Sequence, residues 1–258
     1  MKLYFLGTCA GTEPILGWRH QSFAVEAGDG VYWFDAGEGS SFTAHTMGVD
    51  LLSVKGIFIS HTHLDHIGGL PNLLWNIRKL KWILRREPKF GVIKLFMPNP
   101  ESWDGLRLFL NNTEGNNFSE VINVEVKNVT DGIIFSDENI KVEALHNLHL
   151  GEAGNGEWKS FAYRIYCEGK KIVYTGDLGN LGEVNDMVGE SCDILLIETG
   201  HYGYTETLEK IKDVKADTVM FTHNGADIRR NPLEAAYIAQ KKYKRKIVIC
   251  TDGSTLTV

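Results

Sequence analysis

The chain has 258 residues, of which 43% are hydrophobic and 23% charged, so it can bury a large core and has the composition of an ordinary globular protein. Its net charge of −6 excludes the general attraction to nucleic acid or to an anionic membrane that a basic protein would have. The apolar start of the chain is too short for a signal peptide, and no run of about eighteen apolar residues predicts a membrane helix. We therefore expect a cytoplasmic protein of the bacterial type that has no membrane partner.

The four cysteines are widely separated and never form a Cys-x-x-Cys pair. This spacing excludes both a zinc ribbon and a disulfide framework, so reduced thiols are expected. The cysteines are Cys9, Cys167, Cys192 and Cys250.

The first predicted elements are a hairpin and a strand. Residues 22–34 contain two apolar stretches separated by the turn Gly28-Asp29-Gly30, a pattern typical of a β-hairpin. The hairpin leads into residues 35–39, Asp-Ala-Gly-Glu-Gly. A helix is expected next, followed by a buried strand over residues 56–59.

The most informative segment follows that strand. Residues 60–66 read Ser-His-Thr-His-Leu-Asp-His, which places three imidazoles and one carboxylate within six positions: His61, His63, Asp65 and His66. The first two can project from one side of the strand end, and the last two come from the turn beyond it. The spacing suits two metal ions better than one, and the donor types favour zinc, with iron and manganese as competitors. A polar loop with hydrogen-bonded histidines is the alternative.

A helix is predicted over residues 69–86, and its second half interleaves basic and apolar side chains from Arg78 to Arg86. This is the one candidate for a local nucleic-acid patch, although a solvated helix face explains it equally well. The next elements are predicted as strands near 92–96, 121–126 and 140–145 and a helix over 100–111.

A second hairpin, over residues 160–174, is a near copy of the first. It leads to Thr175-Gly176-Asp177, and a helix and a buried strand ending in His223 are expected downstream, as in the first half. The similarity predicts a duplicated chain whose two β-rich halves form two sheets packed face to face, with the site along one edge. Chance similarity between short hairpins is the alternative. The last third is predicted to alternate strands and helices over 193–197, 205–212, 218–222, 232–243 and 247–250.

These landmarks resemble the ligand motifs of the metallo-β-lactamase fold superfamily, and their order matches across the whole chain. Within that superfamily, the segments Phe5-Leu6-Gly7-Thr8, Asp35-Ala36-Gly37-Glu38-Gly39 and Gly68-Gly69-Leu70-Pro71 are most similar to the ribonuclease Z branch and its phosphodiesterase relatives. The resemblance rests on the cluster at residues 61–66, on His149, on Asp177 and on His223.

The resemblance implies one domain over residues 1–258, of the α/β class, with a four-layer αββα sandwich. It also implies a dinuclear zinc site with a bridging hydroxide, in which iron or manganese could replace zinc. Residue 146 is also a histidine, but the family pattern favours His149, and an ordinary turn role is the alternative for Asp177. One metal would take His61, His63 and His149, and the other Asp65, His66 and His223, with Asp177 bridging.

Two further residues are candidates for proton transfer. In ribonuclease Z a glutamate at a corresponding strand end works with a histidine of a His-Ser-Thr motif to protonate the leaving group. Glu198 matches that glutamate, but the motif is missing, and His201 could take its role because it lies three residues beyond the carboxylate. A surface or capping histidine is the alternative. The candidate catalytic residues are therefore Asp65, Glu198 and His201.

The departures from the family bear on the substrate. Bacterial ribonuclease Z proteins carry an inserted arm that grips tRNA, and the short hairpin between Ala162 and Asp177 leaves no space for it. We therefore expect a metal-dependent hydrolase that acts on a phosphodiester, such as a small nucleotide or an oligonucleotide end, and not on tRNA. A lactone, thioester or amide hydrolase and an iron-binding redox or sensor protein are the alternatives, and a homodimer is compatible with each.

Overall fold

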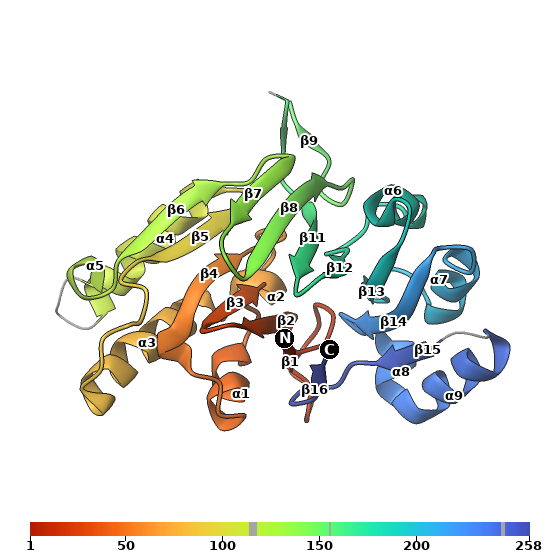
Figure 1. Ribbon diagram of the computed structural model, residues 1–258, viewed down its shortest axis with the longest axis horizontal. Coiled ribbons are helices and arrows are strands. Elements are labelled where there is room, and N and C mark those ends of the chain that lie inside the picture. The colour runs from red at the N-terminus through yellow and green to blue at the C-terminus, as the bar shows by residue number, and fades with distance from the viewer. Residues whose placement is uncertain (114–117, 155, 244–245) are drawn as a thin grey trace. The chain divides into compact units, whose positions relative to one another are not determined.

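The computed structural model describes residues 1–113, 118–154, 156–243 and 246–258 (Figure 1). It divides into two compact units, each built on one seven-stranded sheet. Unit 1 consists of residues 1–7, 19–129 and 252–258, and unit 2 of residues 8–18 and 130–251. A mixed α/β fold with two large sheets was predicted, and the structure confirms it.

The sheet of unit 1 has the strand order β16-β1-β2-β3-β4-β5-β6. The pairs β16–β1, β1–β2 and β2–β3 are antiparallel, whereas β3, β4, β5 and β6 run parallel to one another. The carboxyl ends of the parallel strands therefore lie at one edge. The strands are β1 (Lys2–Gly7), β2 (Ser22–Ala27), β3 (Gly30–Phe34), β4 (Val54–Phe58), β5 (Ile93–Met97), β6 (Val124–Asn128) and β16 (Thr255–Thr257).

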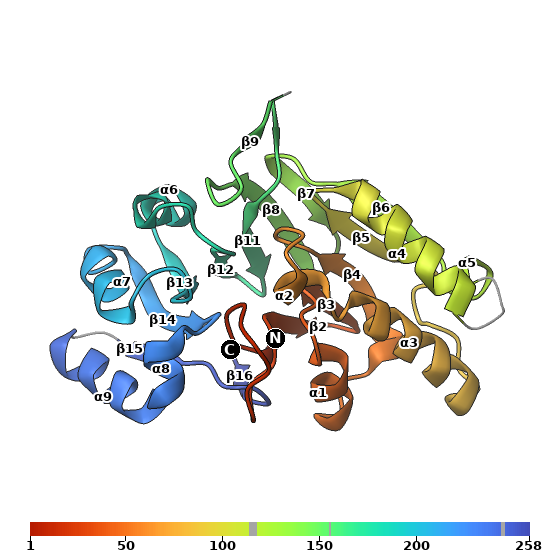
Figure 2. The same cartoon turned by 180° about the vertical axis from the view of Figure 1, so that it is seen from behind.

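Helices pack against one face of this sheet, as Figures 1 and 2 show for α3 and α4. Apolar side chains of α3 recur at helical spacing and contact the core that contains Trp33, Ile57 and Leu95. Because side chains alternate along a strand, the neighbouring phenylalanines point to the opposite face, where the ring of Phe58 stacks on those of Phe34 and Phe96 at 4.9 Å. The helices are α1 (Ser40–Thr46), η1 (Leu51–Ser53), α2 (Leu64–Ile67), α3 (Leu70–Leu84), α4 (Pro100–Thr113) and α5 (Phe118–Val121).

The sheet of unit 2 has the strand order β15-β14-β13-β12-β11-β8-β7. Here too antiparallel hairpin strands lead into a parallel set, which consists of β12, β13, β14 and β15. The strands are β7 (Gly132–Ser136), β8 (Ile140–His146), β11 (Phe161–Cys167), β12 (Lys170–Tyr174), β13 (Cys192–Glu198), β14 (Ala216–Thr222) and β15 (Lys246–Ile249), and a separate pair is formed by β9 (Glu152–Ala153) and β10 (Glu157–Trp158).

The core of unit 2 joins this sheet to its helices. Leu195, Val219 and Phe221 from the central strands belong to the same buried cluster as Met187 of α6 and Leu208 of α7. The helices are η2 (Leu181–Glu183), α6 (Val184–Val188), α7 (Tyr204–Lys210), α8 (Ala226–Arg230) and α9 (Pro232–Lys242).

The two sheets repeat one topology, as the two similar hairpins predicted. In each unit an antiparallel hairpin, β2–β3 or β11–β12, is followed by a strand parallel to it, β4 or β13. The sequence comparison, however, paired the strand before His61 with the strand before His223. In sheet order the counterpart of β4 is β13, which ends in Glu198, and His223 follows the next strand, β14.

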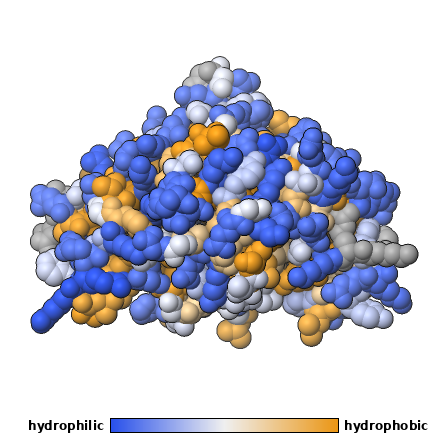
Figure 3. Space-filling view, viewed as in Figure 1, coloured by the Kyte–Doolittle hydropathy of each residue, from blue (hydrophilic) through white to orange (hydrophobic). Residues whose placement is uncertain are grey.

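The described surface is polar. In the view of Figure 3 hydrophilic residues predominate, with apolar ones scattered among them. Within the described ranges no helix combines the length and apolar character needed to cross a bilayer. All four cysteines are buried and free.

The basic run at the end of α3 is largely engaged in contacts within unit 1. Arg78 is buried. Lys81 lies 2.8 Å from Glu87, and Arg86 forms an ion pair with Asp50. These contacts favour the solvated helix face over a nucleic-acid patch.

Candidate metal-binding clusters and proton donor

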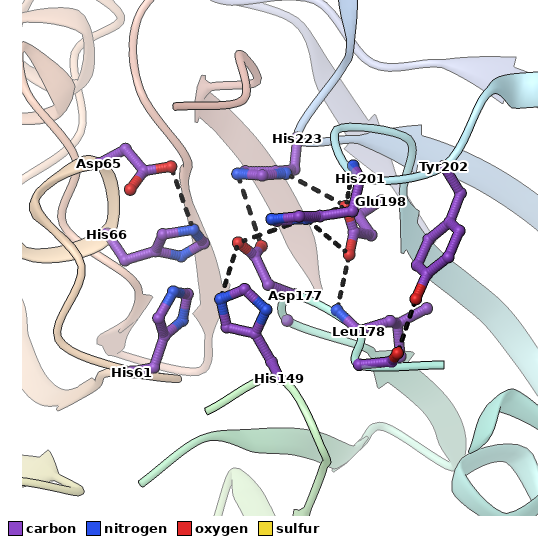
Figure 4. Close-up of polar contacts among 12 residues, drawn as sticks. His61, Asp65, His66, His149, Asp177, Leu178, Glu198, His201, Tyr202 and His223 are labelled. Atoms are coloured by element: carbon purple, nitrogen blue, oxygen red, sulfur yellow. Dashed lines mark hydrogen bonds and ion pairs between the residues drawn. The ribbon is translucent and has the colours of Figure 1, made fainter. Parts of the chain in front are cut away.

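The histidine cluster of unit 1 begins immediately after β4. His61 and His66 are fully buried, whereas His63 is exposed and precedes the short helix α2. The ring of His61 lies 4.6 Å from that of His63 and 4.1 Å from that of His66, measured between centroids. Asp65 Oδ2 lies 3.5 Å from His66 Nε2, as the dashed line in Figure 4 shows. All four predicted side chains of this segment therefore gather at one strand end.

A buried carboxylate that was not assigned a role from the sequence holds this cluster in place. Asp35 Oδ1 accepts a 2.6 Å hydrogen bond from the Ser60 backbone N–H, and Oδ2 accepts one of 2.8 Å from the Ser60 hydroxyl. Asp35 Oδ2 also lies 2.8 Å from His66 Nδ1. Because Nδ1 is engaged in this way, Nε2 is the nitrogen that His66 can present to a metal.

The backbone around Asp35 shows why it faces Ser60. Asp35 follows β3, has a φ of +52° and donates its N–H to the carbonyl of Phe58 at the end of β4. The carbonyl of Ala36 accepts from Gly69 N–H, and a Cβ at Gly69 would lie 2.1 Å from the carbonyl oxygen of Gly37. Glycine at position 69 is therefore required for the close packing of this loop against the start of α3.

A second cluster lies at the carboxyl ends of the parallel strands of unit 2. Asp177 and His223 follow β12 and β14, Glu198 is the last residue of β13, and His149 follows β8. Asp177 Oδ2 lies 3.8 Å from His149 Nε2 and 3.8 Å from His201 Nδ1, and Oδ1 lies 3.4 Å from His223 Nε2 (Figure 4). Asp177 is thus central to three imidazoles.

Glu198 links the segments of the second cluster. Its Oε1 accepts a 2.6 Å hydrogen bond from Leu178 N–H, and its Oε2 accepts one of 2.9 Å from His201 N–H. The same Oε2 lies 2.9 Å from His201 Nδ1 and 3.5 Å from His223 Nδ1. Glu198 is 1% exposed, whereas the side chain of His201 is 43% exposed.

The protonation of this pair follows from these contacts. Burial alone would raise the pKa of Glu198, but the hydrogen bonds of His201 and His223 outweigh it and hold the pKa of Glu198 below its usual range. The hydrogen bond to Glu198 is in turn the largest cause that raises the pKa of His201. The two shifts together favour an ionised Glu198 carboxylate next to a protonated His201 imidazole.

The two histidines near residue 147 have different surroundings. His146 lies 2.6 Å from Asp131 through Nδ1 and stacks on Trp158 at 4.0 Å, outside the cluster. His149 faces Asp177. This geometry supports the preference for His149 as the ligand.

The donor sets of both clusters fit divalent transition metals. Imidazole nitrogens and carboxylate oxygens are zinc ligands, and the contact of Asp35 with His66 is the kind of support that orients a metal-binding histidine. In unit 2 His149 follows β8 and Asp177 follows β12. Because the two residues come from different strand ends, the fold and not the local sequence brings them together.

The sequence is similar to those of known proteins. A family model described as "Anti-Pycsar protein Apyc1" matches residues 1–227. Ribonuclease Z from Picrophilus torridus is 45% identical over 73 residues, which cover 28% of this chain and 23% of that protein. Ribonuclease Z from Treponema denticola is 30% identical over 147 residues, which cover 56% of this chain and 43% of that protein. The matched segments span less than half the length of either relative.

Solved structures show the same fold. Human tRNase Z, short form, superposes with a TM-score of 0.72 at 20% identity, covering 100% of this chain and 99% of that one. The metallo-β-lactamase fold protein YhfI from Bacillus subtilis superposes with a TM-score of 0.69 at 16% identity, covering 99% and 98%. The predicted metallo-β-lactamase fold and the resemblance to ribonuclease Z are therefore confirmed.

Proposed function

Because the chain belongs to the family described as anti-Pycsar protein Apyc1, we propose that it is a metal-dependent hydrolase acting on a phosphodiester. The substrate class is a small one, such as a cyclic nucleotide or a short oligonucleotide end. The observation that carries this proposal is that histidine and carboxylate donors gather at strand ends in both units, each set held by a buried carboxylate, Asp35 or Glu198. The ribonuclease Z relatives support the phosphodiester as the bond that is cleaved.

We propose that the seven predicted ligands hold two divalent ions, with zinc first and iron or manganese as competitors. Two bound ions would lower the pKa of a water molecule and stabilise the negative charge that develops on the phosphoryl group. Asp35 keeps His66 Nε2 available as a donor, and Asp177 would be the ligand that the two ions share. The proposed ligands are His61, His63, Asp65, His66, His149, Asp177 and His223.

The proton for the leaving group comes from His201. Its Nδ1 is engaged with Glu198, so the protonated imidazole can donate from Nε2. The partly exposed position of His201 leaves room for a substrate, while buried Glu198 fixes the ring. Asp65, the third candidate catalytic residue, acts in this proposal as a metal ligand.

The shape of the second hairpin supports a small substrate. β11 and β12 are joined by a tight turn, with Cys167 paired to Lys170, so no inserted arm is present there. We therefore propose that tRNA is not the substrate. We also propose that the protein acts in the cytoplasm. A lactone, thioester or amide hydrolase and an iron-based sensor are the competing functions, since the same donors can bind iron and can act on carbonyl compounds.

A substrate panel on metal-analysed protein tests this proposal. It comprises bis-p-nitrophenyl phosphate, a cyclic nucleotide, nitrocefin, an acyl-homoserine lactone and a thioester, with metal-stripped protein as the control. Turnover of phosphodiesters should exceed that of the β-lactam at least about a hundredfold, which is about 3 kcal/mol of transition-state stabilisation. Comparable rates on both would contradict the proposal, and a preference for the lactone or thioester would favour the competing hydrolase.

A further inference from the structure

Unit 2 contains a set of donors that extends beyond the seven proposed ligands. One ligand atom from each of Asp177, Glu198, His201 and His223 lies within 4.8 Å of the others. Two imidazoles and two carboxylates are a donor set that zinc accepts. Glu198 and His201 belong to this set, although neither is a ligand of the proposed hydrolytic centre.

The separations between these atoms suit one small ion. Zinc bonds of about 2.0–2.1 Å in a tetrahedron place neighbouring ligand atoms roughly 3.3 Å apart. Glu198 Oε2 lies 2.9 Å from His201 Nδ1 and 3.5 Å from His223 Nδ1. His201 Nδ1 lies 3.8 Å from Asp177 Oδ2. These three separations lie on both sides of the tetrahedral value, so shifts of the side chains would complete the site.

The surroundings allow an ion to enter and be held. The side chain of His201 is 43% exposed and opens the set to solvent, whereas that of Glu198 is fully buried. Backbone N–H groups of Leu178 and His201 anchor the two carboxylate oxygens of Glu198, so this ligand is already positioned. Two carboxylates also provide the negative charge that a desolvated cation needs.

His223 can serve this ion and the proposed hydrolytic centre through different nitrogens, as a bridging imidazolate that releases its remaining ring proton to solvent. Its Nε2 faces Asp177 Oδ1 at 3.4 Å, and its Nδ1 faces Glu198 Oε2 at 3.5 Å (Figure 4). This ion would share Asp177 and His223 with the proposed hydrolytic centre, and its binding would break the hydrogen bond between Glu198 and His201. The affinity for this ion is therefore lower than the affinity of the proposed hydrolytic centre for its two ions.

We propose that Asp177, Glu198, His201 and His223 bind a third, weaker zinc ion that inhibits the enzyme. Binding at His201 Nδ1 releases to solvent the proton that Nδ1 shares with Glu198, because a metal ligand must be deprotonated. The proton left on Nε2 then belongs to a neutral imidazole, whose loss of that proton would leave an imidazolate. The metal-bound ring is therefore a far weaker acid than the imidazolium, and His201 no longer protonates the leaving group. The inhibitory effect rests on the proposed function, whereas the binding itself does not.

Equilibrium dialysis against increasing zinc, followed by metal analysis, tests the binding independently of activity. The wild-type protein should take up a third ion per chain after the first two, and His201→Ala should stop at two. His146→Ala is the matched control, because His146 is a similarly exposed histidine outside the set, and it should bind three ions. Saturation of the wild type at two ions, or a third ion retained by His201→Ala, would overturn the proposal.

Two further measurements separate binding from folding and from function. Thermal melting at two equivalents of zinc checks that His201→Ala is folded. If this variant is unfolded, Co²⁺ titration of the wild type replaces it as the test. New d–d bands should then appear at the third equivalent of Co²⁺, and their absence would count against the site. The wild-type rate on an alkyl phosphodiester should fall at least about tenfold on uptake of the third ion, while the lower basal rate of His201→Ala should not change. A third ion that leaves the wild-type rate unchanged would overturn the inhibition. An absence of phosphodiester turnover at every zinc level would instead remove the proposed function and leave the dialysis result to decide the site.

Discussion

Asp35 shows how one buried carboxylate can determine the geometry of several donors. It contacts both the backbone and the hydroxyl of Ser60 as well as His66 Nδ1, over sequence separations of 25 and 31 residues. The sequence placed Asp35 in a family motif but did not indicate these contacts, because they depend on the parallel pairing of β3 with β4. The position of Asp35 directly after a buried strand is the sequence feature that could have indicated its role.

Asp35→Asn is expected to lower metal affinity about 10- to 100-fold, the usual effect of removing a group that supports a ligand. The amide cannot accept from Ser60 and His66 with the strength of a carboxylate. Competition with a chelator measures the change. Asp29→Asn, at an exposed hairpin turn, is the control and should behave as the wild type. Equal affinities for the two variants would mean that Asp35 does not support a metal ligand.

His201→Ala is expected to lose about a hundred- to ten-thousandfold in turnover of an alkyl phosphodiester while keeping two metal ions. A good leaving group needs no proton, so the loss on an activated nitrophenyl ester should be much smaller. Steady-state rates on both substrates measure the difference. Equal losses on the two esters, or loss of the two metals, would rule out the role of His201 as proton donor.

At the scale of elements, short-range sequence patterns predicted those helices and strands whose formation depends on local sequence. The two hairpins, α3, α4 and the strands that end before His61, Asp177, Glu198 and His223 were found from turn residues and apolar runs. The elements that the sequence did not predict include β7, β16 and α5. β7 is an edge strand, β16 has three residues that pair only with β1, and α5 is a single turn, so none of them carries a long periodic signal. The sequence comparison matched β4 to β14, and this match was wrong. Two strands of the two units are equivalent when they hold the same place in their sheets, and the order of strands in a sheet depends on long-range pairing.

Close packing between two loops of unit 2 gives a prediction at this scale. A Cβ at Gly179 would lie 2.4 Å from the carbonyl carbon of Leu148, so Gly179→Ala must push apart the segments that carry Asp177 and His149. Overpacking of this kind costs about 1–3 kcal/mol. Both the melting temperature and the retention of metal during dialysis should fall.

Gly105→Ala is the matched control for that substitution. Gly105 lies in α4, and apart from its chain neighbours and the backbone of its own helix no atom lies within 4 Å of a Cβ placed there. Because alanine favours a helix more than glycine does, the melting temperature should rise slightly. Unchanged melting and metal retention in Gly179→Ala would show that the two loops can separate without effect.

At the scale of the whole molecule, metal binding should be linked to stability. Ions that bind the folded chain more tightly than the unfolded chain raise the melting temperature in proportion to the logarithm of their concentration. Treatment with a chelator should therefore abolish hydrolysis and lower the melting temperature, and added zinc should restore both. A chelator-treated protein that keeps its activity would contradict a metal-dependent mechanism.

The central claim is that the seven proposed ligands hold two metal ions in one dinuclear centre. The most direct measurement is anomalous X-ray diffraction from crystals grown with two equivalents of zinc per chain. We predict two peaks about 3.5–4 Å apart with Asp177 between them, one bound by histidines 61, 63 and 149 and the other by Asp65, His66 and His223. A single peak, or two peaks with other ligands, would contradict the account.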